Sequence, residues 1–91
     1  MYVAVHHHIN DPEKFWAKAQ ELVPKLPAGI QLYQSMPTKD GTQGVCIWEG
    51  ESVASVRAYL EGNMSAFSKN DYFEMENKDS IGLPSGVGAG K

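Results

Sequence analysis

Apolar and polar residues alternate along the first nine positions of the chain. In an extended strand, one side of residues 2–9 carries the more apolar set, which is Val3, Val5, His7 and Ile9. The other side carries Tyr2, Ala4, His6 and His8. The pattern predicts a β-strand over residues 2–9 whose first set faces a core.

The period then changes to that of a helix. Asp11 is a candidate N-cap, and Pro12 suits the first helical position. Apolar residues follow at helical spacing, namely Phe15, Ala19, Leu22, Val23 and Leu26. We expect Pro24 to tighten or end the last turn, and Pro27-Ala28-Gly29 to close the helix.

Alternation returns over residues 30–36 and 45–49, on either side of the polar loop 37–44. Asp40-Gly41 in that loop is a hairpin signal. Ser52 is a candidate cap for a second helix, whose apolar stripe comprises Val53, Val56, Tyr59 and Leu60 and which stops near Gly62-Asn63. After an irregular segment at 63–69, residues 71–77 alternate as a fourth strand, with Phe73 and Met75 on the core side.

The element order strand–helix–strand therefore occurs twice. This βαββαβ order predicts an α+β, ferredoxin-like fold, in which a four-stranded antiparallel sheet has strands one and three in the middle and both helices on one face. We expect one domain over residues 1–84, ending in a docking turn at 81–84. Residues 85–91 are rich in glycine and are expected to form a flexible tail.

The sheet face opposite the helices is expected to carry many rings and polar groups together: Tyr2, Ala4, His6, His8, Gln31, Tyr33, Cys46, Trp48, Tyr72, Glu74 and Glu76. Such a face suits neither open water nor a dry core, so we expect a second copy of the sheet to cover it. With 91 residues and a single cysteine, the chain has a small core and no internal disulfide. Both points favour a homodimer.

Composition excludes several kinds of partner. The net charge of −3 argues against nucleic acid, which usually needs a basic face. No apolar run approaches the roughly 20 residues of a membrane span. There is no signal-peptide pattern, so we expect a cytoplasmic location.

Five segments resemble the dimeric α/β-barrel superfamily and a group of short uncharacterised bacterial proteins: Phe15-Trp16, Gly29-Ile30-Gln31-Leu32, Val45-Cys46-Ile47-Trp48-Glu49, Ser68-Lys69-Asn70-Asp71-Tyr72-Phe73-Glu74 and Gly82-Leu83-Pro84. The resemblance covers roughly residues 2–84 by the length and order of the elements. It implies two facing sheets in a homodimer. The superfamily includes monooxygenases, isomerases, cyclases and metal-binding proteins, and no catalytic residue is carried over because no single motif unites them.

His6 and His8 share a strand face, so two imidazoles could bind one metal ion. Cys46, Glu74 and Glu76 have the expected parity to complete a site for zinc or nickel. The alternative is that both histidines form hydrogen bonds at the dimer interface with Tyr33, Tyr72 or the glutamates.

His7 points the other way, toward the helices. It is a candidate general base in a pocket near Trp16 or Tyr59, or else a core histidine whose hydrogen bonds are satisfied. Trp16, Tyr59 and Trp48 are candidate ligand-binding rings, or anchors of the core or interface. Cys46 fits a buried structural thiol better than a nucleophile.

These observations favour a small homodimeric protein that binds a small molecule or a metal ion. The alternative is a cofactor-independent enzyme of monooxygenase, isomerase or cyclase type, with a histidine in the pocket. A third possibility is an interaction domain without a ligand.

Overall fold

The computed structural model describes residues 1–76 and contains four strands, two α-helices and one 3-10 turn. In chain order these are β1 (Tyr2–Ile9), α1 (Pro12–Leu22), η1 (Val23–Lys25), β2 (Gln31–Pro37), β3 (Gln43–Glu49), α2 (Val53–Met64) and β4 (Ser68–Met75). The docking turn expected at 81–84 and the tail expected at 85–91 lie outside the described residues.

Both helices begin at the predicted caps. The Asp11 side chain accepts a hydrogen bond from the Lys14 backbone N–H at 3.1 Å, with Pro12 at the first helical position. Ser52 and Ser55 form a capping box, in which each side chain accepts from the other residue's backbone N–H, at 3.0 and 3.1 Å. Pro24 lies in η1, so the last turn after α1 is tightened as expected.

The chain between α2 and β4 is shorter than the sequence suggests. α2 continues to Met64, and β4 already begins at Ser68, three residues before the strand expected at 71. Ser68 Oγ donates to the Met64 carbonyl oxygen at 3.3 Å, which ties the start of the strand to the end of the helix.

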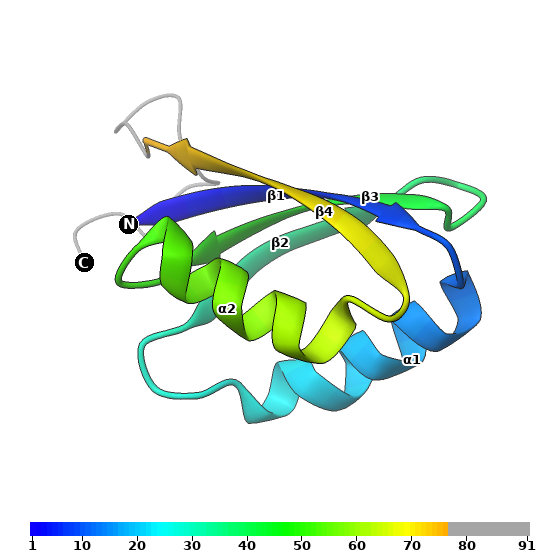
Figure 1. The fold of residues 1–91 in the computed structure, drawn as a ribbon, viewed down its shortest axis with the longest axis horizontal. Helices are drawn as coiled ribbons and strands as arrows, with labels where there is room; N and C mark the ends of the chain where they lie inside the picture. The colour runs from blue at the N-terminus through cyan, green and yellow to red at the C-terminus, as the bar shows by residue number, and fades with distance from the viewer. Residues whose placement is uncertain (77–91) are drawn as a thin grey trace.

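The four strands form one antiparallel sheet in the order β2-β3-β1-β4, and both helices cover the same face of it (Figure 1). The predicted α+β class is confirmed, as are the four-stranded antiparallel sheet and the two helices. β1 is central, with β3 on one side and β4 on the other. We call the side of the sheet that faces α1 and α2 the helix face, and the other side the open face.

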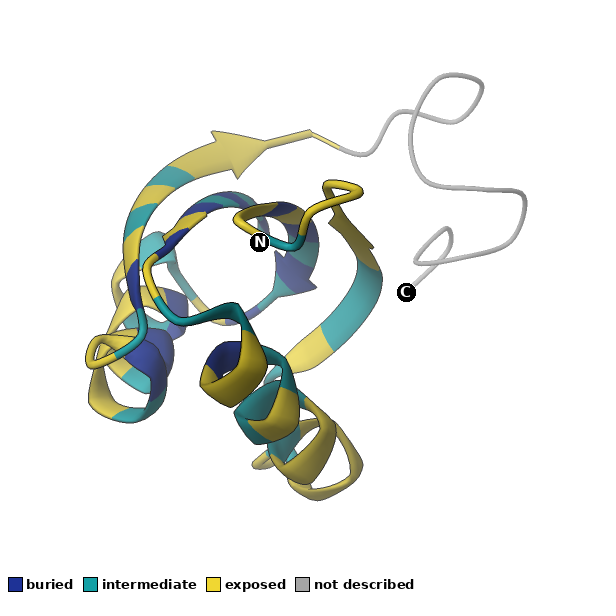
Figure 2. Cartoon of the chain, turned by 90° about the vertical axis from the view of Figure 1, so that its right-hand side faces the viewer, coloured by how far each residue is buried: buried dark blue, intermediate teal, exposed yellow. Residues whose placement is uncertain are grey.

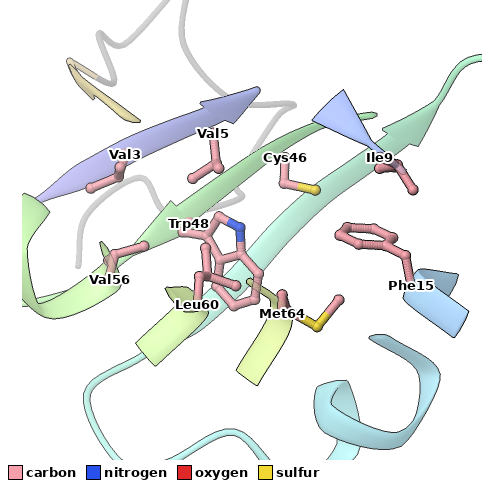
Figure 3. Close-up of a cluster of buried hydrophobic side chains, with 9 residues drawn as sticks. All are labelled: Val3, Val5, Ile9, Phe15, Cys46, Trp48, Val56, Leu60 and Met64. Atoms are coloured by element: carbon pink, nitrogen blue, oxygen red, sulfur yellow. The ribbon is translucent and has the colours of Figure 1, made fainter. Parts of the chain in front are cut away.

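The core lies between the helix face and the helices. It is formed by nine buried apolar residues, which are drawn in Figure 3: Val3, Val5, Ile9, Phe15, Cys46, Trp48, Val56, Leu60 and Met64. Exposed residues occupy the outer sides of both helices and the end of β4 (Figure 2). The predicted orientation of the first strand is confirmed, because Val3, Val5, His7 and Ile9 are all buried.

The predicted orientation of the third strand is wrong. Trp48 pairs with Val3 and Cys46 pairs with Val5, and residues paired directly across strands share a face. Cys46 and Trp48 are therefore buried on the helix face, and Val45 and Ile47 occupy the open face. Both sides of this strand are apolar, so alternation alone did not distinguish them.

The fourth strand is reversed in the same way. Tyr72 pairs with Val5 and Glu74 with Val3, which places both on the helix face. Phe73 and Met75, which were expected in the core, lie on the open face and are 53% and 47% exposed.

An irregular register interrupts β2. Leu32 pairs with Trp48 but Gln34 pairs with Ile47, so Tyr33 is an extra residue in the ladder. An extra residue of this kind exchanges the faces of the residues on either side of it. Leu32 thus lies on the helix face and Gln34 on the open face, although strict alternation along residues 30–36 would place both on one side.

Neither helix among residues 1–76 has the length and apolar character needed to span a membrane.

Candidate functional site

A pocket of about 440 Å³ lies between the helix face and the two helices. Its walls are mostly apolar and come from α1, η1, β2, β3 and α2: among them Phe15, Trp16, Leu22, Leu32, Leu60 and Met64. Two of the three predicted ligand-binding rings, Trp16 and Trp48, line it, and His7 lines it as well. Tyr59 does not line the pocket, although the centroid of its ring lies 6.4 Å from that of Trp48.

Trp48, whose side chain lines this pocket, carries an unpaired donor. Its side chain is 5% exposed and lies within the core cluster of Figure 3. The indole Nε1–H has no hydrogen-bond partner among the described residues. The other indole of the pocket is satisfied, because Trp16 Nε1–H donates to the Gly41 carbonyl oxygen at 3.1 Å. Leaving a buried donor unpaired costs roughly 1–3 kcal/mol.

His7 brings an acceptor. The residue is 1% exposed, and its ring packs edge-on against Phe15, with the centroids 5.0 Å apart. Nδ1 lies 2.6 Å from Oδ1 of Asn70. Burial lowers the pKa of His7, an effect that the hydrogen bond with Asn70 only partly opposes. The ring is therefore neutral at neutral pH.

Asn70 is held from its other side by α2. Its Nδ2–H donates to Glu61 Oε2 at 2.9 Å, and Tyr72 O–H donates to the same carboxylate oxygen at 2.5 Å. The hydrogen bond from Tyr72 lowers the pKa of Glu61 most, and the one from Asn70 lowers it further. The carboxylate is therefore ionised. The Arg57 guanidinium lies 4.9 Å from the centre of the Tyr72 ring and covers the outer side of this group.

Cys46 is a wall of the pocket rather than a nucleophile. Its thiol is buried and donates to Ser35 Oγ at 3.3 Å. Burial raises the pKa of the thiol, which disfavours the reactive thiolate.

The predicted metal set is divided between the two faces of the sheet. His6 and His8 lie on the open face, whereas Cys46 and Glu74 lie on the helix face. The residue that joins the two histidines is Asp71, and the ligand atoms of the three lie within 4.8 Å of one another. This group could hold a metal ion. In the structure the imidazoles are hydrogen-bonded instead, His6 Nε2 with Gln43 Oε1 at 2.9 Å and His8 Nε2 with Asp71 Oδ2 at 3.0 Å.

The sequence did not point to Asn70, Glu61 or Asp71 as site residues. Each reaches its partner through strand register or helix placement. Asn70 faces His7 directly across β1 and β4, and Asp71 faces His6. Asn70 precedes the strand expected at 71–77, so the sequence pattern gave it no cross-strand partner.

No family model, curated protein or solved structure matches the chain. What the protein does is therefore inferred from its own side chains.

Proposed function

We propose that the protein binds a compact, uncharged and mostly apolar molecule in the pocket between the helix face and the helices. The observation that carries this proposal is the unpaired Trp48 Nε1–H, which is buried in the wall of a cavity. A ligand whose hydrogen-bond acceptor reached this donor, once the pocket wall adjusted, would recover the free energy lost by burying it. The volume of about 440 Å³ lies within the usual range of small-molecule sites, about 300–1,000 Å³.

The pocket walls define the chemistry of this molecule. Among the described residues, no Asp, Glu, Lys or Arg lines the pocket, so nothing there would compensate a buried ligand charge. Aromatic and aliphatic side chains supply the contact area. Trp48 offers one donor and the neutral His7 one acceptor, which suits a molecule with few polar atoms.

A pair of matched probes tests the proposal. α-Tetralone and tetralin share a bicyclic skeleton, but only the first carries a carbonyl acceptor. We expect α-tetralone to bind more tightly, by up to about tenfold for one net hydrogen bond. Saturation-transfer NMR and thermal shift measure the difference.

Three variants link this preference to the pocket. Trp48→Phe should abolish the preference for α-tetralone, whereas Trp16→Phe should retain it because the Trp16 N–H already has a partner. Ala19→Leu places extra atoms in the pocket and should weaken the binding of both probes while the chain stays folded. The proposal fails if wild-type protein binds neither probe, or if Trp48→Phe leaves the preference unchanged.

We further propose that the open face is a homodimer interface, which would complete the α/β barrel that the resemblance implies. Large apolar side chains are exposed on the outer strands and on β3: Met36, Val45, Phe73 and Met75, at 68%, 50%, 53% and 47%. Exposed apolar groups gathered on one sheet face are typical of a protein contact. Because this face belongs to a single sheet, a second copy offers a surface of the same shape and polarity.

A further inference from the structure

Three side chains from three elements form a line of hydrogen bonds that ends at the pocket. Glu61 on α2 accepts from Asn70 on β4, and Asn70 Oδ1 accepts from His7 on β1, with distances of 2.9 and 2.6 Å. His7 and Asn70 are direct cross-strand partners, so the register of the sheet sets their separation.

This line determines which nitrogen of His7 carries the proton. Asn70 uses its N–H₂ group toward Glu61, so its carbonyl oxygen faces the imidazole. An oxygen can only accept, and the neutral ring therefore holds its proton on Nδ1. Nε2 keeps a lone pair, and no described residue donates to it. In contrast to a histidine that only fills a core, His7 presents an unused basic atom on a ring that lines a cavity.

The line is also fixed at its outer end. Glu61 is held by Tyr72 as well as by Asn70, and Tyr72 lies beneath Arg57. Phe15 of α1 packs on the His7 ring. Many catalytic sites contain a base that is oriented by a second group, which a third group orients in turn.

We propose that His7 is a general base that removes a proton from an uncharged carbon acid bound in the pocket, with Asn70 and Glu61 as its positioning residues. The proposal rests on the proposed binding function of the pocket. In the step, a C–H bond of the ligand breaks and Nε2–H forms. The electron pair of the C–H bond moves to an electronegative atom of the ligand, and the unpaired Trp48 Nε1–H, on a ring that lines the pocket, is the nearest candidate donor for that developing charge once the wall adjusts. The imidazolium then returns the proton to the product or to water, so that no oxidant or cofactor is consumed.

The elimination of 5-nitrobenzisoxazole tests this step without knowledge of the natural substrate. A base removes the ring C–H proton, the electron pair forms a nitrile as the N–O bond breaks, and the released phenolate is coloured. The molecule is compact, aromatic and uncharged, as the pocket requires. We expect wild-type protein to give saturable turnover.

Two variants separate His7 from the other histidines. His7→Gln keeps a polar side chain beside Asn70 but removes the base, and we expect it to lower kcat by about 100-fold or more with little change in KM. His8→Gln removes an exposed imidazole on the open face and should leave turnover unchanged.

Nitrogen-15 NMR of the imidazoles tests the positioning residues. We expect His7 to show the Nδ1–H tautomer in wild-type protein and in Glu61→Gln, which retains an acceptor for Asn70. Asn70→Ala should release the ring to a mixture of tautomers and reduce kcat, whereas loss of a purely structural contact would leave the tautomer unchanged.

Each outcome decides one question. If Trp fluorescence shows that the probe binds but no turnover occurs, the base is disproved and the binding pocket stands. If the probe does not bind and the α-tetralone pair does not bind, both proposals fail. A His7 ring protonated on Nε2 would overturn the base whatever the probe does.

Discussion

His7 Nδ1 and Asn70 Oδ1 lie 2.6 Å apart, although the two residues are 63 positions apart in the chain. They face each other across β1 and β4. The contact joins the first strand to the last described one and holds a buried polar ring in place.

The first prediction concerns this contact. Asn70→Ala leaves the buried His7 Nδ1–H without an acceptor, so we expect the free energy of unfolding to fall by about 1–3 kcal/mol. Urea denaturation measures the change. The neighbouring exposed residue gives the control, because Lys69→Ala should stay within about 0.5 kcal/mol of wild type. Equal stabilities for wild type and Asn70→Ala would show that the hydrogen bond contributes nothing.

The second prediction concerns pH. Burial places the pKa of His7 in the folded protein below its unfolded value of about 6.5, so below that pH the unfolded state binds more protons. The contribution of His7 to stability is therefore complete above about pH 6.5, and it is lost as the pH falls from there toward the folded pKa. His7→Gln should show a weaker decline between about pH 7 and 5 than wild type. Parallel stability curves for the two proteins would contradict the sign or the size of the shift.

Glu61 acts in a different pH window. Its pKa is lowered in the folded state, so its contribution is lost as the pH falls below the unfolded carboxyl value of about 4.3. The two effects have the same direction, but the one from His7 appears first on acidification.

The third prediction compares two glycines. A Cβ at Gly50 would lie 2.7 Å from Val56 Cγ2, whereas a Cβ at Gly62 would meet nothing within 4 Å. Gly50→Ala should therefore destabilise the fold by about 1–3 kcal/mol, because β3 and α2 must separate. Gly62→Ala lies within α2 and should stabilise it by up to about 1 kcal/mol. Thermal unfolding of both variants measures this opposite pair of effects, and a shift of the same sign in both would be inconsistent with the packing.

The fourth prediction concerns the proposed dimer. Light scattering after gel filtration should give close to twice the chain mass of 10.0 kDa. Phe73→Lys places a charge on the open face, on the outer strand β4, and should yield monomers. Val23→Lys changes an apolar residue that is 43% exposed but lies in η1, and it should leave the dimer intact. A wild-type monomer at micromolar concentration would disprove the interface.

The elements of the fold could be predicted because each has a local signal. Ser52 and Asp11 cap their helices through bonds to residues three positions away, and β1 has one side that is clearly more apolar. Local periodicity and capping chemistry are present in the sequence itself.

The faces of the other strands could not be predicted because their signals are ambiguous. On β3, the pair Cys46 and Trp48 is no more apolar than the pair Val45 and Ile47. In β4, Tyr72 is an aromatic residue whose hydroxyl reaches Glu61, which lets it turn toward the helices. The side of such a strand is decided by its register with β1, and register is a long-range property.

The parts of the candidate site that depend on one strand alone could be predicted, whereas the parts that depend on strand register could not. The alternation of residues along one strand predicts that His7 lies on the opposite face from His6 and His8, and the structure shows this arrangement. The partners Asn70 and Asp71 depend on how β4 is aligned with β1. A sequence without that alignment offers only a list of polar residues.

The rate at which the buried thiol of Cys46 is labelled can report how often the pocket opens. Cys46 is the single cysteine of the chain, it lines the pocket, and it is 4% exposed. A thiol reagent can reach it only when the wall of the pocket opens, so the labelling rate reports the frequency of opening in the native protein. A molecule that occupies the pocket should slow the labelling of Cys46. Candidate ligands can therefore be ranked by how much each one lowers the labelling rate.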